Sequence, residues 1–200
     1  MTTSQKRGSY AKTAGRREEI LEAAIEVFAT HGFRNGSLRQ VAERVGMSQA
    51  GLLHHFTNKN ELLAEVLALR DHRSQEQSNL LAEPGIETLR GMVATIAYNK
   101  SMPGLVELHC VLSAEATAAD HPAHDYFVER YVWVVEFLTT AFVALASQNK
   151  LSPGVNPESA ARGLVAVMDG LQVQWLLDRD ALDMADETRN YLQPLLTVEL

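Results

Sequence analysis

The sequence predicts an all-α protein. Apolar residues recur three and four positions apart along most of the 200 residues, and no segment shows sustained alternation of apolar and polar residues. The composition, 46% hydrophobic and 22% charged, is that of a globular chain that can bury a core. Cys110 is the one cysteine and cannot form an intramolecular disulfide, and no apolar run reaches the ~18 residues that a membrane span needs. We therefore expect a globular cytoplasmic protein with no membrane segment.

The charge is distributed unevenly along the chain. Residues 1–73 contain eleven Lys and Arg against eight Asp and Glu, whereas residues 74–200 contain seven against seventeen. The first seventeen residues carry five basic residues and no acidic one, and they lack the apolar segment of a secretory signal. A basic end on an acidic body is typical of a polyanion-binding module joined to a body with another role. A solubilising tail would explain the first residues equally well.

Two helices are expected first. A stripe of apolar residues predicts a helix that starts at Arg17 and ends at Gly32, a residue suited to a helix C-cap. Ser37 and Gln40 then fit a capping box, in which each side chain hydrogen-bonds the other residue's backbone N–H. They predict a short second helix that ends at Gly46.

Two further helices follow directly. Ser48 stands in the N-cap position of a third helix over about residues 49–55. This helix is shorter than the ~12 residues that hold together alone, so Leu52 and Phe56 must pack it against the rest of the domain. A long fourth helix is expected over residues 59–81.

The first clear break in the pattern is Pro84-Gly85. Beyond it, the apolar spacing continues at the helical period, and Pro and Gly separate the segments. We expect five more helices, over residues 86–100, 104–119, 124–149, 157–179 and 184–198.

The second and third helices form a helix-turn-helix pattern, because two short helices are joined by Gly-Met-Ser. Gly46 supplies the left-handed backbone that the turn needs. When Leu52 and Phe56 face inward, the side chains that remain free to enter a DNA major groove are Gln49, Ala50, Gly51 and His54.

Residues 17–63 resemble the DNA-binding domain of TetR-type (tetracycline-repressor-like) transcriptional regulators. The resemblance rests on the elements I-L-x-A-A-x-x-x-F, H-G-F, V-A-x-x-V-G-M-S, L-x-H-H-F and K-x-E-L-L. It implies a basic flexible arm over residues 1–15 and an N-terminal three-helix DNA-binding domain with a helix-turn-helix over residues 16–63. A long helix would link these to a helical ligand-binding and dimerisation domain over residues 64–200.

The resemblance also implies roles in DNA binding. Ser37 and Arg39 would contact phosphate and the groove edge, and His55 and Lys59 would contact backbone phosphates. Leu53 stands where the family usually has Tyr, so this chain lacks that hydroxyl donor. The expected DNA-binding residues are Ser37, Arg39, Ser48, Gln49, Ala50, Gly51, Leu53, His54, His55 and Lys59.

The acidic body contains candidates for a small-molecule pocket. They combine apolar bulk with few polar groups, as ligand sites do, and they favour a largely apolar effector with one hydrogen-bonding end. The alternative is that they are ordinary core residues. The candidates are Met92, Ile96, His109, Tyr131, Val134, Phe137, Leu138, Met168, Gln172 and Trp175.

The segment 157–179 shows a heptad-like apolar seam and a second face of small residues. A helix that is apolar on more than one side is usually buried by more than its own subunit. Together with the last helix, it resembles the homodimer interface of TetR-type proteins, although a self-contained monomer core is the alternative. The expected interface residues are Ala161, Leu164, Met168, Leu171, Trp175, Tyr191, Leu192 and Leu195.

These features predict a ligand-responsive transcriptional regulator, a repressor that binds an inverted-repeat operator in double-stranded DNA as a homodimer and is released by a small-molecule effector. The alternative is a helical small-molecule-binding or interaction protein whose helix-turn-helix is only structural. The sequence contains no nucleophile elbow, P-loop or dinucleotide fingerprint, so we expect no enzyme activity and no cofactor. His109-Cys110 and His121-x-x-His124 lack further ligands at recognisable spacing, so we expect no metal site.

Overall fold

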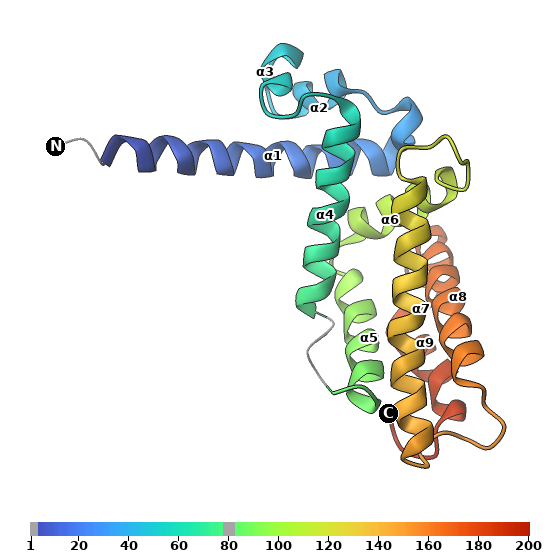
Figure 1. The fold of residues 1–200 in the computed structure, drawn as a ribbon. Coiled ribbons are helices and arrows are strands. Elements are labelled where there is room, and N and C mark those ends of the chain that lie inside the picture. The colour runs from blue at the N-terminus through green and yellow to red at the C-terminus, as the bar shows by residue number, and fades with distance from the viewer. Residues whose placement is uncertain (1–3, 78–82) are drawn as a thin grey trace. The chain divides into compact units, whose positions relative to one another are not determined.

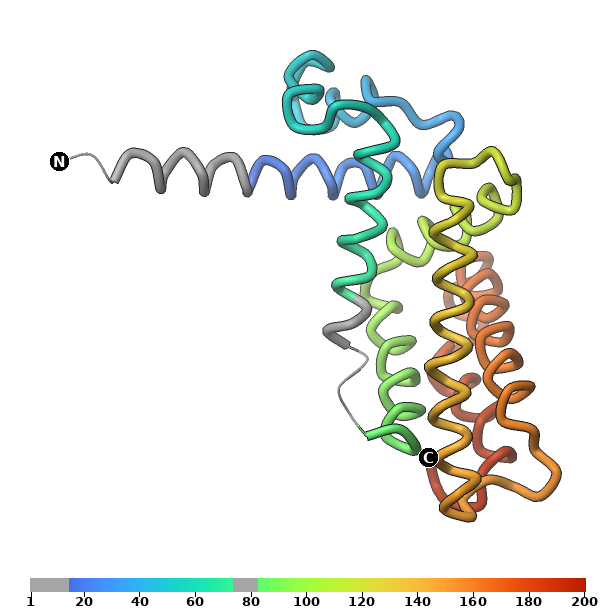
Figure 2. The backbone as a smooth tube through the Cα atoms, viewed as in Figure 1, coloured from blue at the N-terminus to red at the C-terminus, as the bar shows by residue number. Residues whose placement is uncertain are grey.

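The computed structural model describes the backbone of residues 4–77 and 83–200, and the side chains of residues 15–73 and 83–200. Over these residues the chain is helical and contains no strand, apart from a single antiparallel bridge between Leu151 and Leu196. Figures 1 and 2 show the path of the chain. The predicted all-α fold class is confirmed.

The observed helices follow the expected order. They are α1 (Ser4–Asn35), α2 (Leu38–Arg44), α3 (Gln49–Leu53), α4 (Lys59–Gln77), α5 (Ile86–Asn99), α6 (Pro103–Glu115), α7 (His124–Ser147), α8 (Pro157–Leu177), α9 (Met184–Leu192) and the 3-10 helix η1 (Gln193–Leu195). Helix α1 begins well before the expected start at Arg17. The first residues of the expected arm, 1–3, lie outside the described residues, as do the side chains up to residue 14 and the last residues expected in the fourth helix.

The chain divides into two compact units. The first contains residues 1–70 and 107–123, and the second contains residues 71–106 and 124–200. Helices α4 and α6 therefore each contribute residues to both units. The sequence-based division at residue 64 assigns residues 107–123 to the body, whereas the structure groups them with the N-terminal helices.

Side-chain caps set the helix ends in the first unit. Ser37 and Gln40 form the predicted capping box at the start of α2. The Ser48 hydroxyl accepts the Gly51 N–H at the start of α3, 3.0 Å away, and Asn58 Oδ1 accepts the Glu61 N–H of α4 at 2.9 Å. Each cap satisfies a backbone donor that the helix itself leaves unpaired.

The end of α1 is a sharp turn at Gly32. Its backbone has φ 71° and ψ 175°, so the helix is interrupted there. The Glu115 carboxylate lies so close that a Cβ at residue 32 would collide with it. Glu115 Oε2 accepts the N–H of Phe33 at 2.7 Å, which fixes the turn to the end of α6. Glycine is required at this position for both reasons.

The second unit is built on α7 and α8, which pack along each other, with α9 against α5 and α8. Leu138, Phe142 and Leu145 of α7 are fully buried, as is Leu164 of α8. Asp71, the first residue of α4 that belongs to this unit, accepts the Tyr126 hydroxyl of α7 at 2.9 Å and pairs with Arg130.

Most of the predicted dimer seam is buried in this packing. Five of its eight residues are buried within the protomer, so they are not available to a partner subunit. The large apolar residues that α8 exposes are on another face, at Val173 and Leu177. The buried seam residues are Ala161, Leu164, Met168, Trp175 and Leu192.

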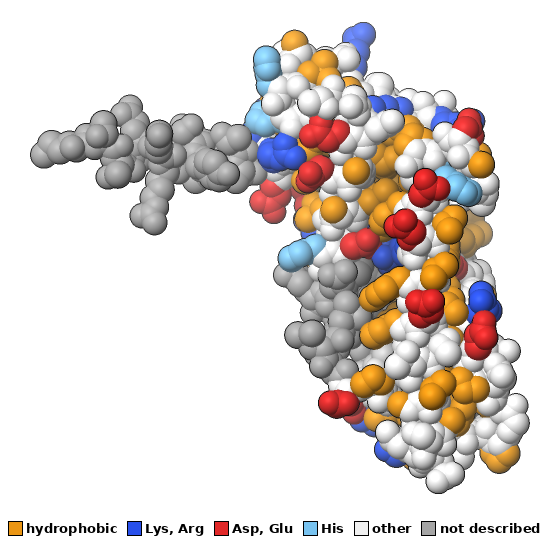
Figure 3. Space-filling view, viewed as in Figure 1, with side chains coloured by type: hydrophobic (Ala, Val, Ile, Leu, Met, Phe, Trp, Pro, Cys, Tyr) orange, Lys and Arg blue, Asp and Glu red, His pale blue; other side chains and the backbone are white. Residues whose placement is uncertain are grey.

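Helix α7 also exposes apolar side chains, at Val128, Val132, Trp133 and Val143. Figure 3 shows hydrophobic side chains along this helix with carboxylates between them. Within the described part of the chain, α7 is the one helix whose length and composition would allow it to cross a membrane, a weak indication by itself.

The turn at Gly32 can be tested against the turn at Gly46. Both glycines have positive φ, but a Cβ at Gly46 would meet nothing within 4 Å. We expect Gly46→Ala to cost about 1–2 kcal/mol of unfolding free energy from backbone strain alone. Gly32→Ala should cost about 3 kcal/mol, since it also displaces the partly buried Glu115 contact. Urea denaturation measures both, and equal losses would contradict the role given to Glu115.

Candidate nucleic-acid interface

The helix-turn-helix is assembled by backbone hydrogen bonds across a tight turn. The N–H of Met47 donates to the Ala42 carbonyl at 3.0 Å, and Gly46 has φ 65°. Leu52 and Phe56 are fully buried, as the sequence predicted, and they hold α3 against the domain although the helix is only five residues long. The turn and the buried pair together fix which side of α3 faces outward.

The outward side of α3 is made of small and polar groups. Gln49, Ala50 and His54 are exposed, and Gly51 and His55 are half-buried. Gly51 has no side chain, so a groove edge can approach the backbone closely there. The arrangement suits insertion into a major groove, which admits an α-helix.

Arg39 on α2 is the most exposed cation beside this face. Its side chain is 78% exposed and its Nε donates to Glu43 at 2.8 Å. This hydrogen bond, together with the charge of Glu43, raises the pKa of Arg39 above its ordinary value. An exposed pair of this kind contributes little stability, so the guanidinium can exchange Glu43 for a phosphate.

Arg16 and Arg17, the first two residues of the predicted DNA-binding domain, make contacts inside it. Arg16 donates to the Val45 carbonyl at the end of α2, at 2.6 Å. Arg17 donates to the His55 carbonyl just after α3, and its guanidinium lies 4.2 Å from the centroid of the Phe56 ring. Both contacts tie α1 to the carbonyl ends of the two short helices, where cations are favoured.

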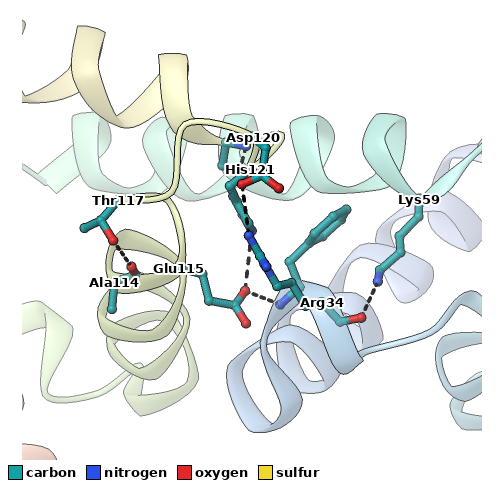
Figure 4. A network of polar contacts seen from close by, with 9 residues as sticks. Arg34, Lys59, Ala114, Glu115, Thr117, Asp120 and His121 are labelled. Carbon is teal, nitrogen blue, oxygen red and sulfur yellow. Dashed lines mark hydrogen bonds and ion pairs between the residues drawn. The ribbon is translucent and has the colours of Figure 1, made fainter.

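The turn at Gly32 is also held from α4. Lys59 Nζ lies 4.2 Å from the centroid of the Phe33 ring and donates to the Arg34 carbonyl at 3.4 Å. Burial lowers the pKa of Lys59, although the charge of Glu115 opposes this. Figure 4 shows that Lys59 and Glu115 reach this turn from different segments of the first unit.

His121 lies behind Phe33 in the same cluster. Its side chain is 0% exposed, and its ring packs edge-on against Phe33 with 5.3 Å between the ring centroids. Nδ1 accepts the Ala123 N–H at 3.2 Å, so in the neutral ring the proton is on Nε2, which lies 3.4 Å from Glu115 Oε2. Arg34 and Asp120, themselves paired at 3.1 Å, are the other charged groups near the ring.

Burial lowers the pKa of His121 below its ordinary value of 6.5, and the nearby Glu115 carboxylate only partly offsets this. The physical reason is that protonation would place a charge in a buried site. It would also end the hydrogen bond that Nδ1 accepts from Ala123. The neutral form is therefore part of the folded domain.

The expected DNA-binding residues are only partly brought together. Those on α2, α3 and the turn between them form one continuous segment, whereas the Lys59 ammonium is turned toward the end of α1. Sequence reasoning did not single out the supporting roles of Arg17, Glu115 and His121. Arg17 was counted with the basic segment, and the pairing of Glu115 with Phe33 spans 82 residues, so no local pattern could reveal it.

The candidate pocket residues are divided between the two units. Six of the ten are buried in the second unit, whereas His109 belongs to the first unit. Tyr131 donates its hydroxyl to Asp169 at 2.7 Å and lines an open groove of 730 Å³ between α7 and α8, which no other candidate lines. The six buried candidates are Met92, Ile96, Leu138, Met168, Gln172 and Trp175. Within the described part of the chain, no group of three or more His, Cys, Asp or Glu is placed to hold a metal ion.

The fold and the site together define a helix-turn-helix DNA-binding protein with a separate helical body. Residues 20–66 match the bacterial regulatory proteins of the tetR family, and residues 86–196 match the C-terminal domain of BetI-type transcriptional repressors. The two matches cover most of the chain. The protein belongs to the TetR family of transcriptional regulators.

Named relatives agree with this assignment. The repressor AcnR of Corynebacterium diphtheriae is 39% identical over 87 residues, which are 43% of this chain and 44% of AcnR. The match thus spans less than half of that relative. The regulator BetI of Agrobacterium fabrum is 25% identical over 85% of this chain and 81% of its own length. A TetR-family regulator from Agrobacterium tumefaciens has a similar fold, with a TM-score of 0.79 at 17% identity over 92% of this chain and all of its own.

The buried histidine predicts a pH dependence of stability. Because the pKa of His121 is lowered in the folded state, the unfolded chain takes up a proton first as the pH falls below about 6.5. The contribution of the neutral His121 to the free energy of unfolding is therefore fully present above that pH, and it is lost as the pH falls through the lower pKa of the folded state. Urea denaturation between pH 8 and 5 should show this loss, and His121→Gln should reduce it.

The matched control for this measurement is His31→Gln, which replaces an exposed histidine of the same unit. It should keep the pH dependence of the wild type. If both variants kept that dependence, His121 would not be its source.

Proposed function

We propose that this protein is a ligand-responsive transcriptional repressor that binds an inverted-repeat operator as a homodimer and is released by a small effector. The observation that carries the proposal is the recognition helix, whose buried residues fix its orientation while Gln49, Ala50 and His54 stay exposed. Membership of the TetR family supports it, and so do the repressors among the relatives. The partners of this chain are thus double-stranded DNA, an effector and a second copy, in the cytoplasm.

In this proposal the contacts with DNA divide into two groups. Gln49 and His54 have donors and acceptors that can read base edges in the major groove. Ser37, Arg39, His55 and Lys59 contact phosphates, which position the domain without reading sequence. The Lys59 ammonium has three N–H donors, so its contact with the Arg34 carbonyl leaves two for a phosphate.

The effector site is proposed in the second unit, near Trp175. This side chain is 3% exposed, and its indole Nε1–H has no hydrogen-bond partner among the described residues. A buried donor without a partner is costly, and a bound molecule with an acceptor oxygen would satisfy it. The buried Met92, Ile96 and Met168 belong to the same unit and suit a largely apolar molecule.

The effector acts by shifting a two-state equilibrium. Helix α4 carries Lys59 at one end and Asp71 near the other, and Asp71 is held by Tyr126 and Arg130 of the effector-binding unit. An effector that favours one arrangement of α4 changes the separation of the two recognition helices in the dimer. The operator requires a separation of about 34 Å, one helical turn. DNA must weaken effector binding by the same factor as the effector weakens DNA binding.

The homodimer interface is proposed on the exposed face of α7 and α8, in place of the buried seam. Val132, Val143 and Val173 are 53%, 52% and 48% exposed, and Leu177 is 82% exposed. The groove between the two helices has Val132, Val135, Val165 and Ala166 among its lining residues. Charged residues line the same groove, at Glu136, Glu158, Arg162 and Asp169. Large side chains that stay apolar and exposed can mark an interaction site, and in a two-fold dimer the same face meets its own copy.

The test of the function is selection of genomic fragments at near-physiological salt, followed by sequencing of what is retained. We expect one inverted repeat. With that repeat, Gln49→Ala should change the preference among base substitutions, whereas Lys59→Met should weaken binding to all sequences alike. Lys59→Met should also reduce the slope of log affinity against log salt by about 0.9, the value for one phosphate contact.

The selection is repeated with protein that has been unfolded and refolded to remove a co-purified effector. Retention of random fragments alone by this stripped protein would favour the alternative, a binding protein whose helix-turn-helix is only structural. If Lys59→Met lowered the thermal stability but kept the salt slope, its role would be limited to the turn at Gly32.

The interface can be tested at Gly170 of α8, where an added Cβ would meet nothing within 4 Å in the protomer. We expect Gly170→Gln to leave the protomer folded and to raise the dimer dissociation constant at least tenfold, about 1.4 kcal/mol, since overpacking is costly. Sedimentation equilibrium measures this constant. The control is Ala97→Gln, at an exposed alanine of α5, which should not change it. An unchanged dimer in Gly170→Gln would place the interface elsewhere.

A further inference from the structure

The recognition helix carries an exposed apolar flank. Leu53 is 39% exposed, and among the described residues it is the one large hydrophobic side chain of the first unit with such exposure. Ala50 lies one helical turn before it and is also exposed. Figure 3 shows hydrophobic side chains at the surface over α2 and α3. We call Ala50 and Leu53 the apolar flank of α3.

The domain's own packing does not use this flank. Leu52 and Phe56, both 0% exposed, are the residues that pack α3 into the core of the domain. Hydrogen bonds from the N–H groups of His55 and Phe56 to the Leu52 carbonyl, 2.8 and 3.1 Å long, close the helix directly behind Leu53. Leu53 therefore stays at the surface because the neighbouring residue already occupies the core.

A leucine side chain has no donor or acceptor, so Leu53 can make no hydrogen bond to a phosphate or a base edge. The major groove presents one apolar group, the 5-methyl group of thymine, which apolar side chains contact. Gly51 lies between Ala50 and Leu53 and has no side chain to hold the helix away from the bases. The flank thus matches the one feature of the groove that Gln49 and His54 cannot read.

We propose that Ala50 and Leu53 read thymine methyl groups in the operator, so that Leu53 is a specificity-determining residue. The inference rests on the proposed function, because it requires that α3 enters a major groove. It adds that the half-site contains at least one thymine whose methyl group is needed for full affinity. At that position, cytosine or uracil is a poor substitute.

The experiment uses the full chain and the inverted repeat retained in the genomic selection. Each thymidine of one half-site is replaced in turn by deoxyuridine, which removes the methyl group and keeps every donor and acceptor. At one or two positions we expect the wild type to bind about fourfold more weakly, the value for one buried methyl-sized group. Leu53→Ala should bind the two duplexes equally at the position that Leu53 reads, whereas a position read by Ala50 should keep its preference.

The matched control is Gln49→Ala, which removes a polar reader from the same helix. It should bind more weakly but keep the fourfold preference for thymine over uracil. Because Leu53 is exposed, Leu53→Ala should unfold at the wild-type temperature, which thermal denaturation checks.

Two results would overturn the inference while the proposed function stands. One is equal binding of thymine and uracil duplexes by the wild type at every position. The other is an unchanged preference in Leu53→Ala, and if that variant also failed to dimerise, the flank would be assigned to a protein contact. Failure to retain any specific repeat would instead overturn the proposed function itself.

Discussion

The arrangement of the first unit depends on the backbone N–H of Phe33. The left-handed turn at Gly32 exposes this N–H, and the Glu115 carboxylate accepts it at 2.7 Å. The ring of Phe33 also contacts the Lys59 ammonium of α4 and the ring of His121, which follows α6. Three segments that are distant in sequence thus meet at one residue. Charge-assisted hydrogen bonds of this kind are stronger than neutral ones, so the cluster can fix their relative positions.

The recognition helix depends on this cluster through α1. Helix α1 ends at the Gly32 turn, and upstream it provides Arg16 and Arg17, which bond to the carbonyls that end α2 and α3. A five-residue helix has no stability of its own, so its orientation follows that of α1. The buried, neutral His121 is consistent with a structural purpose for the cluster, since a charged ring there would raise its free energy.

The sequence predicted the helices, the caps and the helix-turn-helix because these are local features. Ser37 with Gln40, and Ser48 three residues before Gly51, act within a single turn of chain, so their spacing alone indicates their roles. Glu115 and Phe33 are far apart in sequence, and nothing in the pattern near either residue indicates the other. The contact of Arg17 could not be predicted for a related reason, because a basic residue beside other basic residues gives no sign that an aromatic ring will lie against it.

The exposed and buried faces of α8 show what an apolar pattern in the sequence cannot determine. The periodicity of Ala161, Leu164 and Met168 indicates a buried stripe, but it does not distinguish burial by the same subunit from burial by a partner. In the structure α7 and α9 cover that stripe, and the sparser pair Val173 and Leu177 is left outside. An interface between subunits has to be built from what the protomer leaves exposed. The proposed dimer interface therefore follows the weaker apolar pattern on α8, just as the proposed contact with thymine follows Leu53, the apolar residue that α3 does not bury.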